Sequence, residues 1–247
     1  MEIPDVLGAN FIEIDPEVVE GGKKYTIYRN GRPCKVARLD GLPAERVAGF
    51  QALLTDIHKM RAYLSLACEI ASETLKTESV LNTFDSGDRN QVVCSSLYLS
   101  AITLYGKCFT EAKGRRVKLE ESQLKRRLSP DQVEIHDKVK YLRDNWTGHG
   151  GVSDHESLIT VVAFSEREAV PMFIAQGVAI TPVEEMQDIL SLCDPMIELV
   201  EELKKKNEAD VFKNKDTLEF LANLRETAID HVFVPDIVRS KPAGSAK

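Results

Sequence analysis

Three side chains near the middle of this sequence have the types and the spacing for acid–base chemistry on a phosphate: Arg143, Asp144 and His149. An arginine is a permanent cation that forks onto phosphate oxygens, and a histidine gains or loses a proton near neutral pH. RNA carries its own nucleophile, the 2′-hydroxyl, so cleavage needs only a base, an acid and a cation. In this hypothesis His149 acts as general base or acid, Arg143 stabilises the transition-state charge, and Asp144 orients one of them.

The residues before this motif predict a helix that positions it. Ser129 followed by Pro130 is typical of a helix start, with serine as the N-cap and proline as the first helical residue. An apolar stripe at helical spacing marks the face that packs into a core; its members are Ile135, Val139, Leu142 and Trp146. Glycines at 148, 150 and 151 would end the helix, so we expect His149 just beyond it.

Other polar side chains of the same helix are candidates for contacts with RNA. His136 lies two turns before Arg143 and Lys140 lies between them, so we expect all three on one side of the helix. Asn145 is a further candidate. The plainer interpretation is a solvated polar face on which His136 has no role, with Asp144 forming an ordinary salt bridge at the helix end.

A dense basic segment, residues 113–118, precedes the motif helix and is followed by a second one at 125–127. Arg115 and Arg116 of the first segment are candidates for tracking an RNA backbone. A solvated loop and helix face explains these charges equally well. The net charge of −7 argues against a protein that coats nucleic acid nonspecifically, but it leaves room for one local basic groove.

The segment from Cys94 to Lys118, followed by the motif helix, resembles the HEPN superfamily (higher eukaryotes and prokaryotes nucleotide-binding). The hallmark of that superfamily is an arginine, a polar residue, a short spacer and a histidine on an all-helical bundle. Arg143, Asp144 and His149 match this pattern. The preceding helix also matches, because it is nearly all apolar with a tyrosine-rich centre and is followed by a Gly-Arg-Arg patch. The resemblance covers residues 89–151, about a quarter of the chain.

This resemblance implies a metal-independent RNA endonuclease of the toxin or phage-defence type, with an antitoxin protein as a candidate partner. It also implies a homodimer in which two motifs meet across a two-fold axis, because one histidine cannot readily act as acid and base in the same step. The alternative is a non-catalytic module that binds a nucleotide or a protein. In that case Arg143 and His149 only stabilise the helix end, where a cation contributes about 0.3–1 kcal/mol.

Composition points to a soluble cytoplasmic protein. No apolar run approaches the roughly 18 residues of a membrane span, and the first residues lack a basic and apolar leader. The five cysteines are odd in number and widely scattered, as expected for reduced thiols. We expect no cofactor and no metal site.

The helical spacing of apolar residues predicts a mainly α fold, a HEPN-like helical bundle with small β-hairpin decorations. We expect helices over 43–76, 91–112, 130–146, 182–207 with a kink near Pro195, and 216–225. Asn30-Gly31 between alternating runs predicts a hairpin in an N-terminal extension, residues 1–42. Two strands, 157–164 and 169–175, would be inserted in the helical domain, residues 43–226, at about 156–180. Residues 227–247 are expected to form a partly disordered tail.

Overall fold

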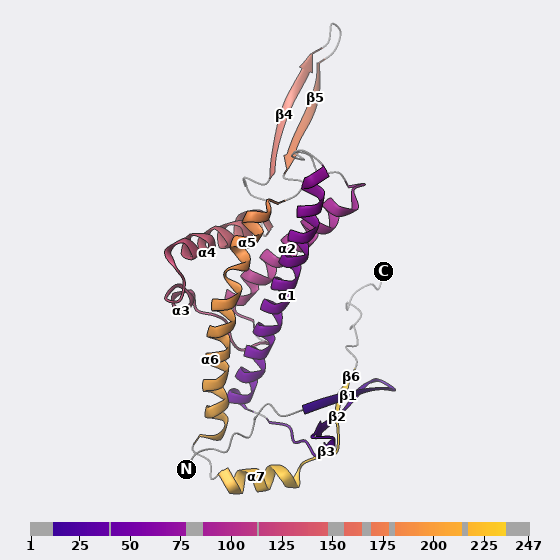
Figure 1. The fold of residues 1–247 in the computed structure, drawn as a ribbon, viewed down its shortest axis with the longest axis vertical. Coiled ribbons are helices and arrows are strands. Elements are labelled where there is room, and N and C mark those ends of the chain that lie inside the picture. Colours follow the sequence, from indigo (N-terminus) through magenta and orange to yellow (C-terminus); the bar gives the residue numbers. More distant parts are fainter. Residues whose placement is uncertain are drawn as a thin grey trace, which may run out of the picture. The chain divides into compact units, whose positions relative to one another are not determined.

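The computed structural model describes residues 12–39, 41–77, 86–112, 114–147, 156–164, 169–177, 181–213 and 217–235. The chain is mainly α-helical with small antiparallel β-hairpins, as the helical periodicity predicts (Figure 1). It divides into two compact units: residues 41–211 hold the helical bundle, and residues 1–40 group with 212–247. The structure thus groups the last helix with the N-terminal strands, whereas the sequence suggested that this helix belongs to the bundle.

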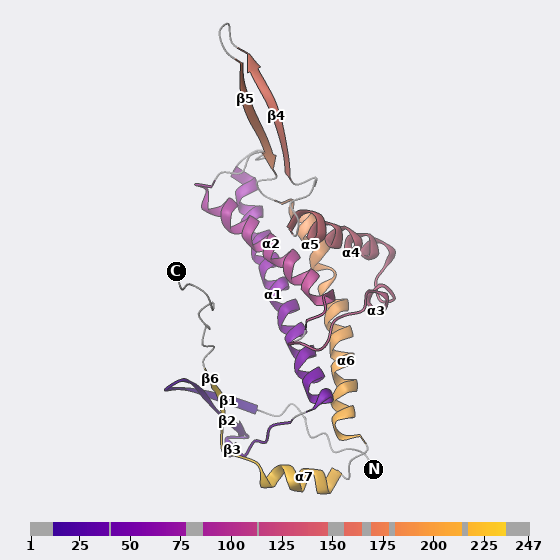
Figure 2. The same ribbon diagram turned by 180° about the vertical axis from the view of Figure 1, so that it is seen from behind.

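Two long helices, α1 (Leu42–Thr77) and α2 (Arg89–Phe109), pack side by side along the bundle (Figures 1 and 2). Asp88 caps the start of α2, because its side chain accepts hydrogen bonds from the amides of Asn90 and Gln91. α2 ends at Phe109 because Thr110 adopts an extended conformation. The helices expected over 43–76 and 91–112 are therefore confirmed, the second with an end three residues earlier than predicted.

α2 is long and apolar enough to cross a membrane by length and composition, which corrects our expectation that no segment reaches that length. Its position in the fold accounts for its composition. Residues on several sides of the helix are buried in the bundle core: Gln91, Cys94, Tyr98, Ala101, Ile102, Tyr105, Gly106 and Cys108. α2 is therefore a core helix of the bundle.

The motif helix α4 (Pro130–Leu142) begins where the sequence predicts. Ser129 and Gln132 form a reciprocal capping box, in which each side chain bonds the backbone amide of the other. The α-helix stops at Leu142, earlier than expected, because the chain widens into a π-helical turn, η1 (Arg143–Thr147). A short helix, α3 (Glu121–Lys125), precedes α4.

The single helix expected over 182–207 is two helices, α5 (Val183–Leu190) and α6 (Cys193–Phe212). The break lies before Pro195 because proline fits the first turn of a helix, where its missing N–H has no intrahelical partner to lose. Both helices contribute to the core through Met186, Ile189, Met196, Leu199 and Val200. The last helix, α7 (Thr217–Glu226), agrees with prediction.

Four strands form a small antiparallel sheet: β1 (Ile12–Val19), β2 (Gly22–Arg29), β3 (Arg32–Cys34) and β6 (Val232–Pro235). Asn30 and Gly31 both have positive φ, 53° and 71°, as the predicted hairpin turn requires. β6 pairs with β2, and this strand was not predicted within the partly disordered tail expected over residues 227–247. The predicted insertion is confirmed as a separate two-stranded hairpin, β4 (Glu156–Phe164) and β5 (Ala169–Gly177).

Candidate functional site

The motif arginine lies against the central helix. Arg143 caps the end of α4, and its side chain crosses α2 at Gly106. A methyl group at Gly106 would fall 2.6 Å from Arg143 Cγ and 2.8 Å from its Nε. Glycine inside a helix costs about 0.5–1 kcal/mol relative to alanine. The close approach of the arginine stem gives this otherwise unfavourable residue a structural reason.

The side chain of Arg143 is partly exposed beside Asp144. Nη1 donates a hydrogen bond to Asp144 Oδ1 at 2.5 Å, and the two side chains are 41% and 51% exposed. Asn145 Nδ2 donates to the carbonyl of Tyr141 at 3.0 Å, which ties this amide to the preceding turn. The structure thus brings Arg143 and Asp144 together at the exposed end of α4.

His149 and the three glycines around it lie outside the described residues. The side chain of Trp146 lies outside the description as well, although its backbone belongs to η1. The predicted place of His149, just past the helix end, stays a prediction.

His136 is not on an exposed face, and its expected role in contacting RNA is wrong for a physical reason. Its side chain is fully buried, and Nδ1 lies 2.5 Å from the hydroxyl of Tyr105. The ring of Phe109 meets the imidazole edge-on, with centroids 5.3 Å apart. His136 and Arg143 do share one side of α4, as their spacing predicts, but that side faces α2. The imidazole therefore anchors α4 to the core.

Two acidic side chains influence this buried histidine from the surface. Nε2 of His136 has no hydrogen-bond partner among the described residues and lies 3.8 Å from Glu121 Oε2. Burial lowers the pKa of His136 below its usual value, and the neighbouring Asp137 and Glu121 oppose that shift.

Lys140, another candidate for binding RNA, is half-buried and bonded to Glu121, whose pKa it lowers. Lys140 therefore belongs to a local ion pair on the side of α4 that carries His136.

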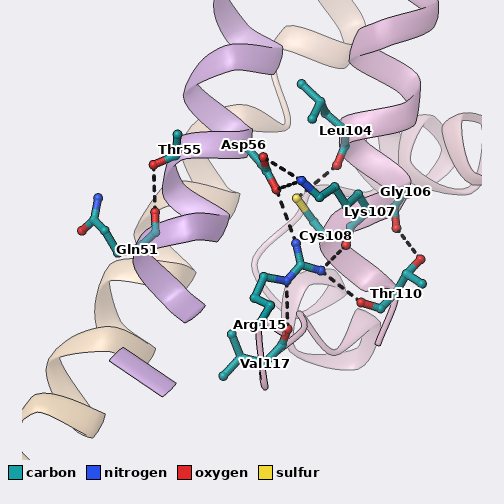
Figure 3. Close-up of polar contacts among 10 residues, drawn as sticks. All are labelled: Gln51, Thr55, Asp56, Leu104, Gly106, Lys107, Cys108, Thr110, Arg115 and Val117. Carbon is teal, nitrogen blue, oxygen red and sulfur yellow. Dashed lines mark hydrogen bonds and ion pairs between the residues drawn. The ribbon is translucent and has the colours of Figure 1, made fainter. Parts of the chain in front are cut away.

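Arg115 is an internal residue, which contradicts its expected place on a basic groove (Figure 3). Its Nε donates to the carbonyl of Val117 at 3.1 Å, and Nη2 donates to the carbonyls of Thr110, at 3.0 Å, and Lys107. Nη1 lies 3.4 Å from Asp56 Oδ2. The guanidinium thus fastens the loop after α2 to both central helices.

Arg116 is exposed and does remain on the surface, paired with Glu45 at 3.3 Å. Lys118, Lys125 and Arg127 of the same basic segments also form ion pairs with nearby carboxylates. The basic segments are therefore largely neutralised locally, and they do not form the open cationic stripe that their sequence suggests.

A second cluster, absent from the sequence-based candidates, lies between α1 and the end of α2. Lys107 Nζ is 2.9 Å from Asp56 Oδ2 and 3.1 Å from Oδ1, and Arg115 approaches the same carboxylate (Figure 3). An open hollow of about 340 Å³ adjoins these charges. We call it the Asp56 hollow; its lining residues are Ala52, Thr55, Asp56, Lys107, Ala112 and Arg115. The hollow combines room, two cations and one carboxylate.

The sequence did contain one signal for this cluster. Asp56 has the helical phase of the buried stripe that includes Leu53, Ile57 and Met60, and a carboxylate in such a stripe requires a cation. The neighbouring Cys108 supplies no nucleophile, because burial raises its pKa to about 12 and leaves the thiol protonated.

Three consecutive residues of α2 thus contact three different polar groups: Tyr105 bonds His136, Gly106 accommodates Arg143, and Lys107 pairs with Asp56. The chemistry this arrangement supports is recognition of anions by the partly exposed side chains of Arg143 and Lys107. Comparisons of the chain with protein-family models, with curated proteins and with solved structures give no match.

Proposed function

We propose that this chain is a metal-independent RNA endonuclease of HEPN type that acts as a homodimer in the cytoplasm, in a toxin or phage-defence system with an antitoxin protein as its partner. One observation carries the proposal. Arg143 is held by its stem against Gly106 while its side chain is 41% exposed beside Asp144, six residues before His149. A positioned arginine that reaches solvent is what the binding of a scissile phosphate requires.

The reaction follows from these side chains. His149 removes the proton of the ribose 2′-hydroxyl, and the resulting oxygen attacks the adjacent phosphorus. Arg143 stabilises the additional negative charge on the phosphate oxygens, with Asp144 holding the guanidinium in place. The histidine of the second copy protonates the departing 5′-oxygen. The products are a 2′,3′-cyclic phosphate and a 5′-hydroxyl.

A second function, a non-catalytic module that binds a nucleotide or protein, is favoured by a different observation. Arg143 and Asp144 form an ion pair at a helix C-terminus, where a cation contributes about 0.3–1 kcal/mol without any catalytic role. The net charge of −7 also suits a protein partner better than extended nucleic acid.

The test is incubation of the purified chain with mixed RNA in excess chelator, followed by analysis of the cleaved ends. His149→Ala should reduce cleavage on the order of 10²–10⁴-fold, the usual contribution of a general acid or base. Arg143→Lys should recover little, since an ammonium cannot reproduce the fork of a guanidinium. His58→Ala, at an exposed histidine of α1, is the matched control and should leave cleavage unchanged.

Cleavage that persists in the His149 variant, or that requires a divalent ion, contradicts the proposed mechanism. A wild-type chain that binds RNA and leaves it intact favours the non-catalytic module. Light scattering checks the dimer: a monomer at micromolar concentration that still cleaves RNA would overturn the two-histidine scheme.

A further inference from the structure

The Asp56 hollow is lined by charged side chains whose charges do not sum to zero. Asp56 and Arg115 are fixed within the fold, with side chains only 10% and 7% exposed. Lys107 is 54% exposed and lies at the mouth of the hollow. Two cations and one carboxylate leave a net charge of +1 in a protein whose overall charge is −7. The hollow therefore attracts anions locally against the general field of the molecule.

The donors and acceptors of the hollow can serve a ligand as well as each other. An ammonium has three N–H donors, and among the described residues Lys107 uses its donors on Asp56 alone. Nη1 of Arg115 carries two hydrogens and directs one to Asp56. A carboxylate accepts about four hydrogen bonds, so Asp56 retains capacity for a hydroxyl. The site thus offers two cationic donors beside one acceptor.

The volume of the hollow is larger than a simple ion requires. Ala52 and Ala112 leave open space that longer side chains would fill, and Thr55 adds a hydroxyl to the wall. The volume, about 340 Å³, lies at the lower end of the range for small-molecule sites. A phosphate with its attached sugar fits both the size and the chemistry.

We propose that the Asp56 hollow binds a ribose phosphate, with Lys107 and Arg115 contacting the phosphate and Asp56 accepting a hydrogen bond from a ribose hydroxyl. Two sources share this chemistry, a nucleotide unit within an RNA strand and a free mononucleotide. The strand is the source we expect, and this choice rests on the proposed function. Lys107 directly follows Gly106, where Arg143 crosses α2, so the hollow and the motif lie about 100° apart on one helical turn.

Binding is measured by fluorescence anisotropy with a labelled twelve-nucleotide RNA of mixed sequence, in chelator, using the full chain with His149→Ala to prevent cleavage. Lys107→Gln should weaken binding about tenfold, as expected for one charged hydrogen bond. It should also lower the dependence of log K on log salt by about 0.7, the value for one phosphate contact of a single strand. Lys205→Gln, an exposed lysine of α6, removes the same charge elsewhere and should change neither quantity.

A variant that fills the hollow but keeps its charges tests whether the RNA enters the hollow or is only attracted to the charges around it. Ala52→Leu fills the hollow without altering any charge, and its exposed helical position tolerates leucine. It should weaken RNA binding by a similar factor. DNA of the same sequence should bind less tightly than RNA, because it lacks the 2′-hydroxyl that Asp56 would accept.

The RNA strand is rejected as the occupant if Lys107→Gln weakens binding no more than Lys205→Gln, or if Ala52→Leu has no effect; the proposal as a whole is overturned if the mononucleotide titration described next also shows no binding that Ala52→Leu removes. A separate titration with uridine 3′-monophosphate follows the amide resonances of Ala52, Thr55 and Ala112. If RNA binding passes both variant tests, the strand occupies the hollow. If only the mononucleotide shifts these resonances, and Ala52→Leu abolishes the shifts, a free nucleotide is the source. If the wild-type chain does not cleave RNA but both variants weaken RNA binding, the proposed nuclease activity is rejected and the binding site is retained. If the wild-type chain cleaves RNA but neither variant weakens binding, only the binding site is rejected.

Discussion

Two glycines lie inside the central helices, and each makes room for a different arginine segment. Gly49 of α1 lies against the backbone carbonyl of Arg115, and a methyl group there would come within 2.7 Å of Val117 Cγ2. Gly106 of α2 lies against the side chain of Arg143. In the first case the closest atom is a backbone carbonyl oxygen, whereas in the second it is Cγ of a side chain. A methyl group at position 49 would therefore have to displace the backbone, whereas one at position 106 would have to displace the stem that positions Arg143.

The two arginines differ in the same sense. The side chain of Arg115 is 7% exposed and donates mainly to backbone carbonyls, so its guanidinium is part of the scaffold. The side chain of Arg143 is 41% exposed, and its terminal group pairs with Asp144 on the surface. Burial and the type of partner, more than the density of positive charge in the sequence, thus separate an arginine that mainly holds the fold together from one whose terminal group lies at the surface.

The largest expected difference is in stability. Arg115→Met should reduce the free energy of unfolding by roughly 3–5 kcal/mol, because it breaks a buried ion pair and leaves buried carbonyls without their donor. Arg143→Met should cost less than about 1 kcal/mol, as expected for an exposed pair. Urea unfolding followed by circular dichroism measures both. If both variants lose the same free energy of unfolding, the two arginines do not differ in their structural role.

The glycines provide the next largest effect. Gly49→Ala should destabilise the chain by about 1–3 kcal/mol, the usual cost of overpacking against atoms that cannot shift. Gly106→Ala should cost less, because helix propensity favours alanine and the Arg143 stem can move.

A double-mutant cycle tests this explanation of Gly106. In the Arg143→Ala background, Gly106→Ala should stabilise the helix by up to about 1 kcal/mol. If Gly106→Ala has the same effect with and without the arginine side chain, the two residues are not coupled, and the contact does not explain the glycine.

Protonation of His136 gives a smaller, pH-dependent effect on the anchor beneath Arg143. Burial lowers the pKa of His136 in the folded chain from its usual 6.5, so the unfolded chain binds this proton more readily. Its contribution is complete above pH 6.5, and stability falls as the pH decreases below that value. The pKa values of Glu121 and Asp137 are lowered from their usual 4.5 and 3.8, so the stability that these two carboxylates contribute is lost only below those pH values.

The measurement is urea unfolding between pH 7 and pH 5. His136→Gln, whose neutral amide can still accept a hydrogen bond from Tyr105, should flatten the dependence in this interval. An unchanged slope would mean that His136 does not titrate differently in the two states.

Much of the fold follows from the spacing of apolar residues, because a helix must bury one face wherever it packs. The sequence predicted a kink near Pro195, where the structure has a break between α5 and α6, because a proline fits both a kink and the first turn of a new helix. β6 was missed because a four-residue strand has little periodicity and its partner β2 lies about 200 residues earlier in the chain.

The site was predicted less completely, for a related reason. Spacing correctly placed His136 and Arg143 on one side of α4, but it could not show that this side meets α2. The pair of Asp56 and Arg115 joins residues 59 positions apart, which no local pattern reveals. Periodicity thus predicts which residues share a face, while the partner of that face is a property of the tertiary structure.

The smallest expected stability change comes from Asp144, and it sharpens the account of Arg143. Both side chains of this pair are about half exposed, so Asp144→Ala should change the free energy of unfolding by only about 0.2–1 kcal/mol. If Asp144 orients the guanidinium for a phosphate, the same variant should reduce RNA cleavage more than its stability loss explains, and Asp144→Glu should recover part of it. Glu202→Ala is the control, because it removes from α6 the carboxylate that pairs with Arg127 at the surface. If Asp144→Ala reduces cleavage no more than Glu202→Ala does, Asp144 only forms a salt bridge at the helix end. In that case its carboxylate neutralises the charge of Arg143 but does not orient the guanidinium toward a phosphate.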